Sequence, residues 1–147
     1  MEQNNEMTII FDSRSCNEGF ARVAVAAFCT QLNPTLEEVA DIKTAISEAI
    51  TNAIIHGYDN QVKKITITCR TENRILYVAV KDEGKGIPDI AKAMEPMFTT
   101  RPELERSGMG FAFMEAFMDQ VEVESDVGKG TIVRMQKKIG NPQPPFI

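Results

Sequence analysis

The sequence predicts an α+β fold, with helices and strands in one domain. Three observations predict it. A chain of 147 residues, 43% of them hydrophobic and 25% charged, can bury one core and is too short to indicate two domains. A long helical stripe of apolar residues occupies its first half, and two pairs of short strand-like runs follow. We expect residues 1–140 to form this single domain and residues 141–147, with their three prolines, to be a disordered tail.

The charge and the apolar pattern exclude several functional classes. A net charge of −5 is wrong for a protein held to nucleic acid by phosphate contacts, so we expect no direct nucleic-acid binding. No run of 18 apolar residues is present and Met1–Asn5 lacks a signal-peptide pattern, which predicts a cytoplasmic protein without a membrane partner. The three cysteines share no C-x-x-C spacing, so we expect reduced thiols that pack as small hydrophobic residues. They are Cys16, Cys29 and Cys69.

The first two elements are predicted to be a strand and a helix. Met7–Phe11 is a short β-branched run, and Ser15 followed by Glu18 has the spacing of a capping box that begins a helix. This helix carries Glu18 and Arg22 at i, i+4, as an exposed pair that is either an ordinary surface ion pair or a docking surface. Away from that pair we expect one apolar face, made of Phe20, Val23, Ala24, Ala27 and Phe28.

A second, longer helix follows the break at Asn33 and Pro34. Thr35 and Glu38 form a capping box that begins it, and Gly57 is a natural C-terminal cap that ends it. Between them runs a continuous apolar stripe with the spacing i, i+3, i+4, i+7, which predicts a helix packed on a core. The stripe consists of Ile42, Ala45, Ile46, Ala49, Ile50, Ala53 and Ile54.

Glu48 and Asn52 are one turn apart on the flank of this stripe, where the helix borders the core. Such a carboxylate and amide are either a surface hydrogen-bonded pair, which is common on helices, or the polar edge of a pocket. His56 is on the same side, and we interpret it as a packing or capping residue at the helix end.

The second half is predicted to hold two hairpins separated by a long loop and a helix. A loop of this length inside a compact domain is usually functional. The predicted elements are strands Lys64–Thr71 and Arg74–Lys81 around a turn at Glu72–Asn73, a loop over 82–107, helix Gly110–Met118, and strands Val121–Glu124 and Thr131–Lys137 around a turn at Asp126–Gly130.

Glycine-containing motifs supply the candidate chemistry. Asp82 at a strand end, with Gly84, Gly86 and Ile87 behind it, is either a glycine turn or a site where the carboxylate accepts a hydrogen bond from a base and the glycines pass a purine ring. The run Ser107–Gly110 opens a helix, whose free N–H groups can hold an anion.

A polar loop lies between these two motifs. Thr99, Thr100 and Arg101 offer two hydroxyls and a cation, as a lid over phosphates requires. The third glycine turn, 128–131, is interpreted as the turn of the last hairpin.

In order and spacing, these motifs resemble the nucleotide-binding boxes of the GHKL ATPase and kinase superfamily over nearly the whole chain. The stretches SEAITNAIIHGY and FTTRPELERSGMGF are most similar to the bacterial anti-sigma factor serine kinases. This resemblance implies a two-layer (Bergerat) fold of helices on a mixed, mostly antiparallel sheet, with ATP or ADP between the layers.

The resemblance also implies roles for residues and partners. Glu48 becomes the base for a serine hydroxyl, Asn52 the ligand of Mg²⁺, and Asp82 the reader of adenine. The activity implied is that of a homodimeric serine kinase that inhibits a sporulation sigma factor and phosphorylates an anti-anti-sigma protein. The other nucleotide-contact candidates are Gly84, Gly86, Ile87, Thr99, Thr100, Arg101, Ser107, Gly108, Met109, Gly110 and Thr131, and the partner-binding candidates are Glu18 and Arg22.

Two other functions are compatible with the motifs. One is the detached ATP-binding domain of a histidine kinase or gyrase-like ATPase, which the lack of a helical dimerisation region or transducer domain in this sequence disfavours. The other is a pure binding module, in which nucleotide changes partner affinity and no phosphate moves. Physically, transfer to a serine needs positioning, charge neutralisation and one proton acceptor, and candidates for all three are present.

Overall fold

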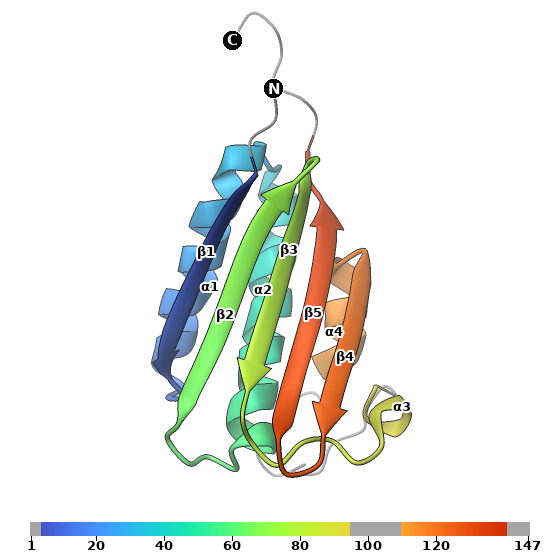
Figure 1. Cartoon of the computed structure of the whole chain (residues 1–147). Helices are drawn as coiled ribbons and strands as arrows, with labels where there is room; N and C mark the ends of the chain where they lie inside the picture. Colours follow the sequence, from blue (N-terminus) through green and yellow to red (C-terminus); the bar gives the residue numbers. More distant parts are fainter. Residues whose placement is uncertain (1–3, 95–109, 141–147) are drawn as a thin grey trace, which may run out of the picture.

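The computed structural model describes residues 4–94 and 110–140 and has two layers, a sheet and the helices that cover one of its faces (Figure 1). The predicted α+β two-layer fold is confirmed. The strands are β1 (Asn5–Asp12), β2 (Lys64–Glu72), β3 (Ile75–Asp82), β4 (Gln120–Asp126) and β5 (Gly130–Lys138). The helices are α1 (Asn17–Cys29), α2 (Leu36–Asn52), α3 (Ile90–Ala93) and α4 (Gly110–Phe117), with a 3₁₀ turn at Thr30–Leu32 and a π-helical turn at Ala53–Gly57.

The sheet has the order β1-β2-β3-β5-β4, and each of the four pairings among the described strands is antiparallel, whereas the resemblance implied a mixed, mostly antiparallel sheet. Both predicted hairpins are present. The β2–β3 turn lies one residue later than predicted, because Glu72 pairs with Ile75 and the two residues between them, Asn73 and Arg74, have left-handed φ values of 51° and 64°. Two consecutive left-handed residues make the type of turn whose twist matches an antiparallel hairpin.

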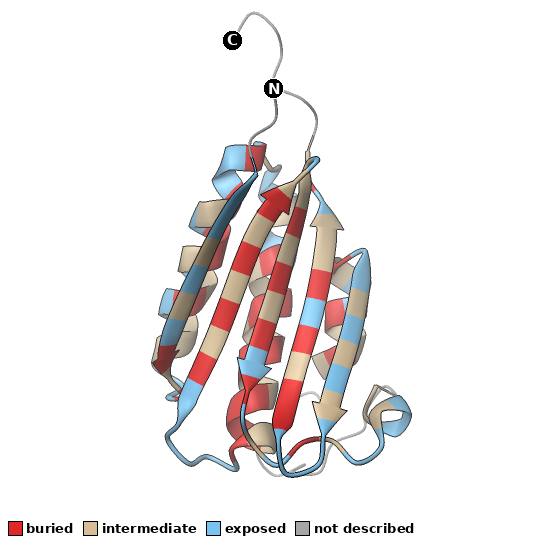
Figure 2. Cartoon of the chain, viewed as in Figure 1, coloured by how far each residue is buried: buried red, intermediate tan, exposed pale blue. Residues whose placement is uncertain are grey.

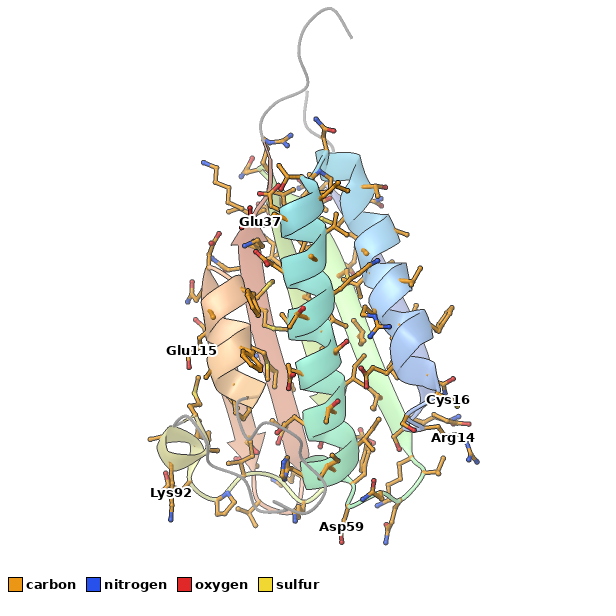
Figure 3. All side chains as sticks on the ribbon, turned by 180° about the vertical axis from the view of Figure 1, so that it is seen from behind. Arg14, Cys16, Glu37, Asp59, Lys92 and Glu115 are labelled. Atoms are coloured by element: carbon orange, nitrogen blue, oxygen red, sulfur yellow. The ribbon has the colours of Figure 1, made fainter. Side chains whose placement is uncertain are left out.

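The core lies between the sheet and α2. Side chains alternate along β2, so that Ile65, Ile67 and Cys69 point to the helices and are fully buried (Figure 2). The apolar stripe of α2 meets them as predicted, with Ile42, Ile46 and Ile50 fully buried. Helix α2 therefore occupies the middle of the helical layer, with α1 on one side and α4 on the other (Figure 3).

The apolar face predicted for α1 does not face the core. Phe20 and Val23 are 61% and 56% exposed, and the helix buries Ala21, Val25 and Cys29 instead. The two sets have nearly the same helical spacing, so periodicity could not separate them. The smaller side chains face inward because they let α1 lie close to α2 and the sheet.

The two predicted capping boxes have different outcomes. Thr35 and Glu38 form theirs, with each side chain accepting a hydrogen bond from the other residue's N–H. The box predicted at Ser15 is wrong, since Cys16 is the N-cap residue of α1 and makes no side-chain cap bond. The Glu18 carboxylate accepts a hydrogen bond from Thr51 on α2 instead.

The three cysteines are free, as predicted, and Cys29 and Cys69 are buried. The predicted packing is wrong for Cys16, which is exposed. Within residues 4–94 and 110–140, no helix has the length and apolar character needed to cross a bilayer.

Candidate functional site

Two of the three glycine motifs, 82–87 and 128–131, meet at one end of the sheet, where β3 ends, the π-turn after α2 ends and β4 turns into β5 (Figure 1). A Cβ atom at Gly57 would lie 2.8 Å from the Asp82 carboxyl carbon, and one at Gly84 would overlap the Gly57 carbonyl oxygen. Lys85 N–H donates to that same carbonyl at 3.0 Å. The prediction that Gly57 is the C-terminal cap is wrong, because the π-turn ends on Gly57 and Tyr58 is the cap residue. The φ of Gly57 is not positive, and its missing side chain makes room for Asp82.

Asp82 is a buried carboxylate at the centre of this junction. It is 4% exposed, pairs with Thr131 across β3 and β5, and accepts a hydrogen bond from Gly84 N–H at 2.9 Å. Burial raises the pKa of the Asp82 carboxyl to about 6, although the backbone N–H groups of Gly84 and Thr131 oppose that shift. A buried acceptor of this kind favours a ligand that brings its own hydrogen-bond donor.

The loop after Asp82 is held against the β4–β5 hairpin. Gly128 N–H donates to the Lys85 carbonyl at 2.7 Å, and Ile87 N–H donates to the Ser125 hydroxyl at 2.7 Å. Gly86, at φ +78°, would overlap the carbonyl of Asp126 if it carried a Cβ atom. Gly84 and Gly86 must therefore lack a side chain, because backbone atoms of Gly57 and Asp126 lie where a Cβ atom would be.

The third glycine turn also contributes to the junction. A Cβ atom at Gly130, where φ is +113°, would overlap the Asp82 carbonyl oxygen. Thr131 is 3% exposed, and its hydroxyl is 2.8 Å from that of Ser125. The segment is the turn of the last hairpin, as predicted, and it also closes one side of the Asp82 environment.

Tyr58 is a site residue that the motifs did not single out. Its ring is 3% exposed, its hydroxyl donates to the Lys64 carbonyl at 2.5 Å, and the same hydroxyl accepts from Glu83 N–H at 2.7 Å. Burial raises the pKa of the Tyr58 hydroxyl. Tyr58 thereby ties the end of the π-turn to the start of β2 and to the loop after Asp82. An aromatic residue directly after the helix-ending glycine was the available signal.

Glu48 and Asn52 are both half-buried on α2. Their neighbours Ser47 and Thr51 bond to α1, and one residue turns a helix by about 100°, so Glu48 and Asn52 lie on the flank away from α1. Helix α4 packs beside that flank (Figure 3). The π-turn then leads from Asn52 to Gly57 at the Asp82 junction. His56 is half-buried within this turn.

The remaining predicted site residues lie at the start of α4, between α1 and α2, or outside the described residues. Gly110 is half-buried at the start of α4. Glu18 and Arg22 lie at the boundary of α1 and α2. Their side chains are 26% and 39% exposed, so the pair that was predicted to be exposed is partly buried. Six candidates fall outside the described residues and stay predictions: Thr99, Thr100, Arg101, Ser107, Gly108 and Met109.

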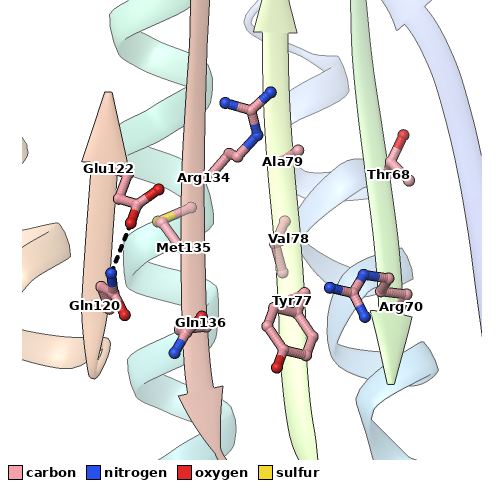
Figure 4. Close-up of a pocket in the computed structure, with 10 residues that line it drawn as sticks. All are labelled: Thr68, Arg70, Tyr77, Val78, Ala79, Gln120, Glu122, Arg134, Met135 and Gln136. Carbon is pink, nitrogen blue, oxygen red and sulfur yellow. Dashed lines mark hydrogen bonds between the residues drawn. The ribbon is translucent and has the colours of Figure 1, made fainter. Parts of the chain in front are cut away.

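A groove of about 320 Å³ lies on the opposite, helix-free face of the sheet (Figure 4). Its arginines have partners of their own. Arg70 stacks over the Tyr77 ring at 3.9 Å and pairs with Glu72 at 2.6 Å, and Arg134 pairs with Glu124 at 2.7 Å. The Asp82 junction, with its buried acceptor, is therefore the stronger candidate site.

The residues present fit an adenine nucleotide. Asp82 offers a buried acceptor for an exocyclic amine, and Asn52 offers an amide oxygen, a ligand type that suits Mg²⁺. No group of three or more His, Cys, Asp or Glu side chains within the described ranges could hold a metal by itself. A hydrated Mg²⁺ that reaches the protein mainly through phosphate oxygens needs no such group.

Comparison with known proteins assigns the chain to a family. Residues 15–137 match the family model described as "Histidine kinase-like ATPase domain". The chain is 60% identical over 141 residues to a protein of Thermoanaerobacter sp. (strain X514) named "Anti-sigma F factor", covering 96% of this chain and 99% of that one. Proteins of the same name from Geobacillus kaustophilus and Clostridium acetobutylicum are each 58% identical, over 136 and 134 residues, covering 92% and 91% of this chain and 93% and 94% of theirs. The chain therefore belongs to the histidine kinase-like ATPase domain family, in the group of relatives named anti-sigma F factor.

Proposed function

We propose that this chain is an anti-sigma factor that inhibits a sporulation sigma factor and uses ATP to phosphorylate an anti-anti-sigma protein on a serine. The observation that carries the proposal is the buried Asp82 carboxylate, enclosed by Gly57, Gly84 and Gly130, in a chain of this ATPase family with anti-sigma relatives. Its site of action is the cytoplasm, where sigma factors work.

Asp82 and Asn52 are assigned to the nucleotide. Asp82 accepts a hydrogen bond from the adenine amine, and Thr131, Gly84, Gly86 and Ile87 hold the carboxylate and its loop in place. Asn52 would hold Mg²⁺, which would supply positive charge to offset that of the phosphates. Thr99, Thr100 and Arg101 are assigned to a lid, and the stretch from Ser107 through Gly108 and Met109 to Gly110 to phosphate binding at the start of α4.

Glu48 is assigned as the general base. It lies one helical turn before Asn52, so a serine hydroxyl that approaches the phosphates meets the carboxylate on the same flank of α2. The carboxylate takes the hydroxyl proton as the serine oxygen bonds to the γ-phosphorus and the bond from phosphorus to the ADP oxygen breaks. His56 lies in the π-turn beyond this pair, and we assign it no chemical step.

The first experiment incubates the protein with γ-labelled ATP and the anti-anti-sigma protein. Glu48→Gln should reduce phosphoryl transfer by about 10²- to 10⁴-fold, the usual value of a positioned base, and leave ATP affinity nearly unchanged because the amide keeps the shape of the carboxylate. Transfer is measured in single turnovers and affinity by calorimetry. A variant within a few-fold of the parent removes Glu48 as the base.

The same assay tests the binding-module alternative. If nucleotide alters sigma affinity but the parent protein transfers no label, the chain is a nucleotide-gated binding module and the kinase assignment fails.

The homodimer is proposed to form along the edge of β1 and the outer flank of α1. Strand β1 is an edge of the described sheet, and α1, the helix that lies behind β1 in Figure 1, exposes the apolar side chains of Phe20 and Val23. An unpaired strand edge next to exposed apolar side chains favours pairing with a second copy. The other edge, β4, carries the exposed acidic residues Glu122 and Glu124, which would repel their own copies.

A further inference from the structure

A polar cluster joins α1 to α2 and is made of Glu18, Arg22, Ser47 and Thr51. Arg22 Nη1 donates to the Ser47 hydroxyl at 3.1 Å and lies 3.6 Å from Glu18 Oε1. The Thr51 hydroxyl donates to Glu18 Oε2 at 3.3 Å. Two residues one turn apart on α1 thus bond to two residues one turn apart on α2.

The cluster fixes the rotation of α1 relative to α2 at one position along the two helices. Small apolar residues of the same two helices, such as Ala21 and Ala45, are fully buried in the core, and their side chains make no hydrogen bonds. Hydrogen bonds have preferred directions, so they hold two packed helices in one register where apolar contacts alone allow sliding.

The α2 members of the cluster are adjacent in sequence to the residues assigned to chemistry. Ser47 directly precedes Glu48, and Thr51 directly precedes Asn52. A partner that binds α1 through Glu18 and Arg22 is therefore connected to Glu48 and Asn52 through two side-chain hydrogen bonds and one turn of α2.

We propose that Ser47 and Thr51 are positioning residues, which hold the Glu18–Arg22 docking pair in register with Glu48 and Asn52. This inference rests on the proposed function, because it requires a partner on α1 and a transfer at α2. In this role the hydroxyls of Ser47 and Thr51 align the serine of the bound anti-anti-sigma protein with Glu48. Neither hydroxyl contacts the reacting atoms.

The test measures phosphoryl transfer in single turnovers at saturating anti-anti-sigma protein. Ser47→Ala and Thr51→Val remove the bonds to α1, and each should lower this rate by about fivefold to tenfold, the net effect of losing one ordinary hydrogen bond that is partly exposed to water. ATP affinity and the melting temperature should stay at parent values, because the groups involved are half-exposed and water replaces the lost bonds.

Three controls separate positioning from packing. Thr51→Ser keeps the hydroxyl and should restore the parent rate. Thr44→Ala changes a threonine of the same helix whose hydroxyl bonds to Ala40 within α2, and it should have no effect. In an Arg22→Ala background, Ser47→Ala should add nothing further, because the group it positions is gone.

The outcomes are distinguishable. If the parent protein transfers phosphate and the Ser47→Ala and Thr51→Val variants match its rate, the positioning role is overturned and the proposed function stands. If Thr44→Ala lowers the rate as much as Ser47→Ala, the effect is general to α2 and the inference also fails. A parent protein that transfers no phosphate overturns the kinase assignment itself.

Discussion

Asp82 combines burial with a proposed role in which its carboxyl group is ionised. Its carboxylate is 4% exposed, and burial raises its pKa to about 6, above the value near 3.8 of an unfolded chain. An acid whose pKa is raised by folding stabilises the folded protein below its unfolded pKa, and that contribution is lost as the pH rises through the folded value. The free energy of unfolding should therefore decrease as the pH rises from 4 to 7, by up to about 3 kcal/mol for a shift of roughly two units in the Asp82 pKa.

Nucleotide binding should have the opposite pH dependence. In the proposed function the ionised carboxylate accepts the adenine amine, so we expect ATP affinity to fall by about tenfold from pH 7 to pH 5, where about a tenth of the carboxyl groups are ionised. Asp82→Asn, which cannot titrate, supplies the control, because its pH profile reports only the phosphates and the lid. It should also bind ATP more weakly at pH 7, by roughly 1–3 kcal/mol.

Calorimetry for affinity and urea unfolding for stability, each from pH 4 to 7.5, measure both effects. Parallel profiles for the parent and Asp82→Asn would exclude Asp82 from the nucleotide site.

Three elements are joined by the hydroxyl of Tyr58. It links the π-turn to β2 through Lys64 and to the loop after β3 through Glu83. Tyr58→Phe leaves the ring but removes the hydrogen-bond partner of the Lys64 carbonyl and of the Glu83 N–H, so we expect the loss of these two part-buried bonds to lower the free energy of unfolding by about 1–3 kcal/mol. The loop should also become less ordered, so ATP affinity should fall about fivefold or more beyond any change in stability.

Tyr77→Phe is the matched control, because Tyr77 lies on the other face of the sheet under Arg70 (Figure 4). Urea unfolding and calorimetry at one pH suffice for both variants. An unchanged ATP affinity for Tyr58→Phe would mean that Tyr58 supports the fold alone.

The proposed dimer concerns the whole molecule. Phe20 and Val23 expose apolar surface beside the β1 edge, so a charge there should be buried without a partner in the dimer and be solvated in the monomer. We expect Phe20→Glu or Val23→Glu to raise the dimer dissociation constant by at least tenfold, measured by sedimentation equilibrium. Leu36→Glu is the control, because Leu36 is 90% exposed at the start of α2. Equal dissociation constants for all three variants would show that the dimer interface does not include Phe20 and Val23.

Local signals in the sequence predicted most of the elements. The Thr35–Glu38 capping box, the stripe of α2 and the two hairpins depend on residues at most a few positions apart, so their rules can be read from the chain. The same signals led to the expectation of a site at Asp82, because a carboxylate at a strand end followed by two glycines is a local pattern.

The tertiary structure decided what those residues contact. Phe20 and Val23 belong to a regular apolar face, yet α1 lies at an edge of the helical layer and only one of its flanks is covered. Gly57 looked like a helix cap, but its missing side chain is required by Asp82, 25 residues later, and the burial that raises the pKa of Asp82 is produced by tertiary packing. Burial and close approach are sums over neighbours distant in the chain, so periodicity and spacing do not record them.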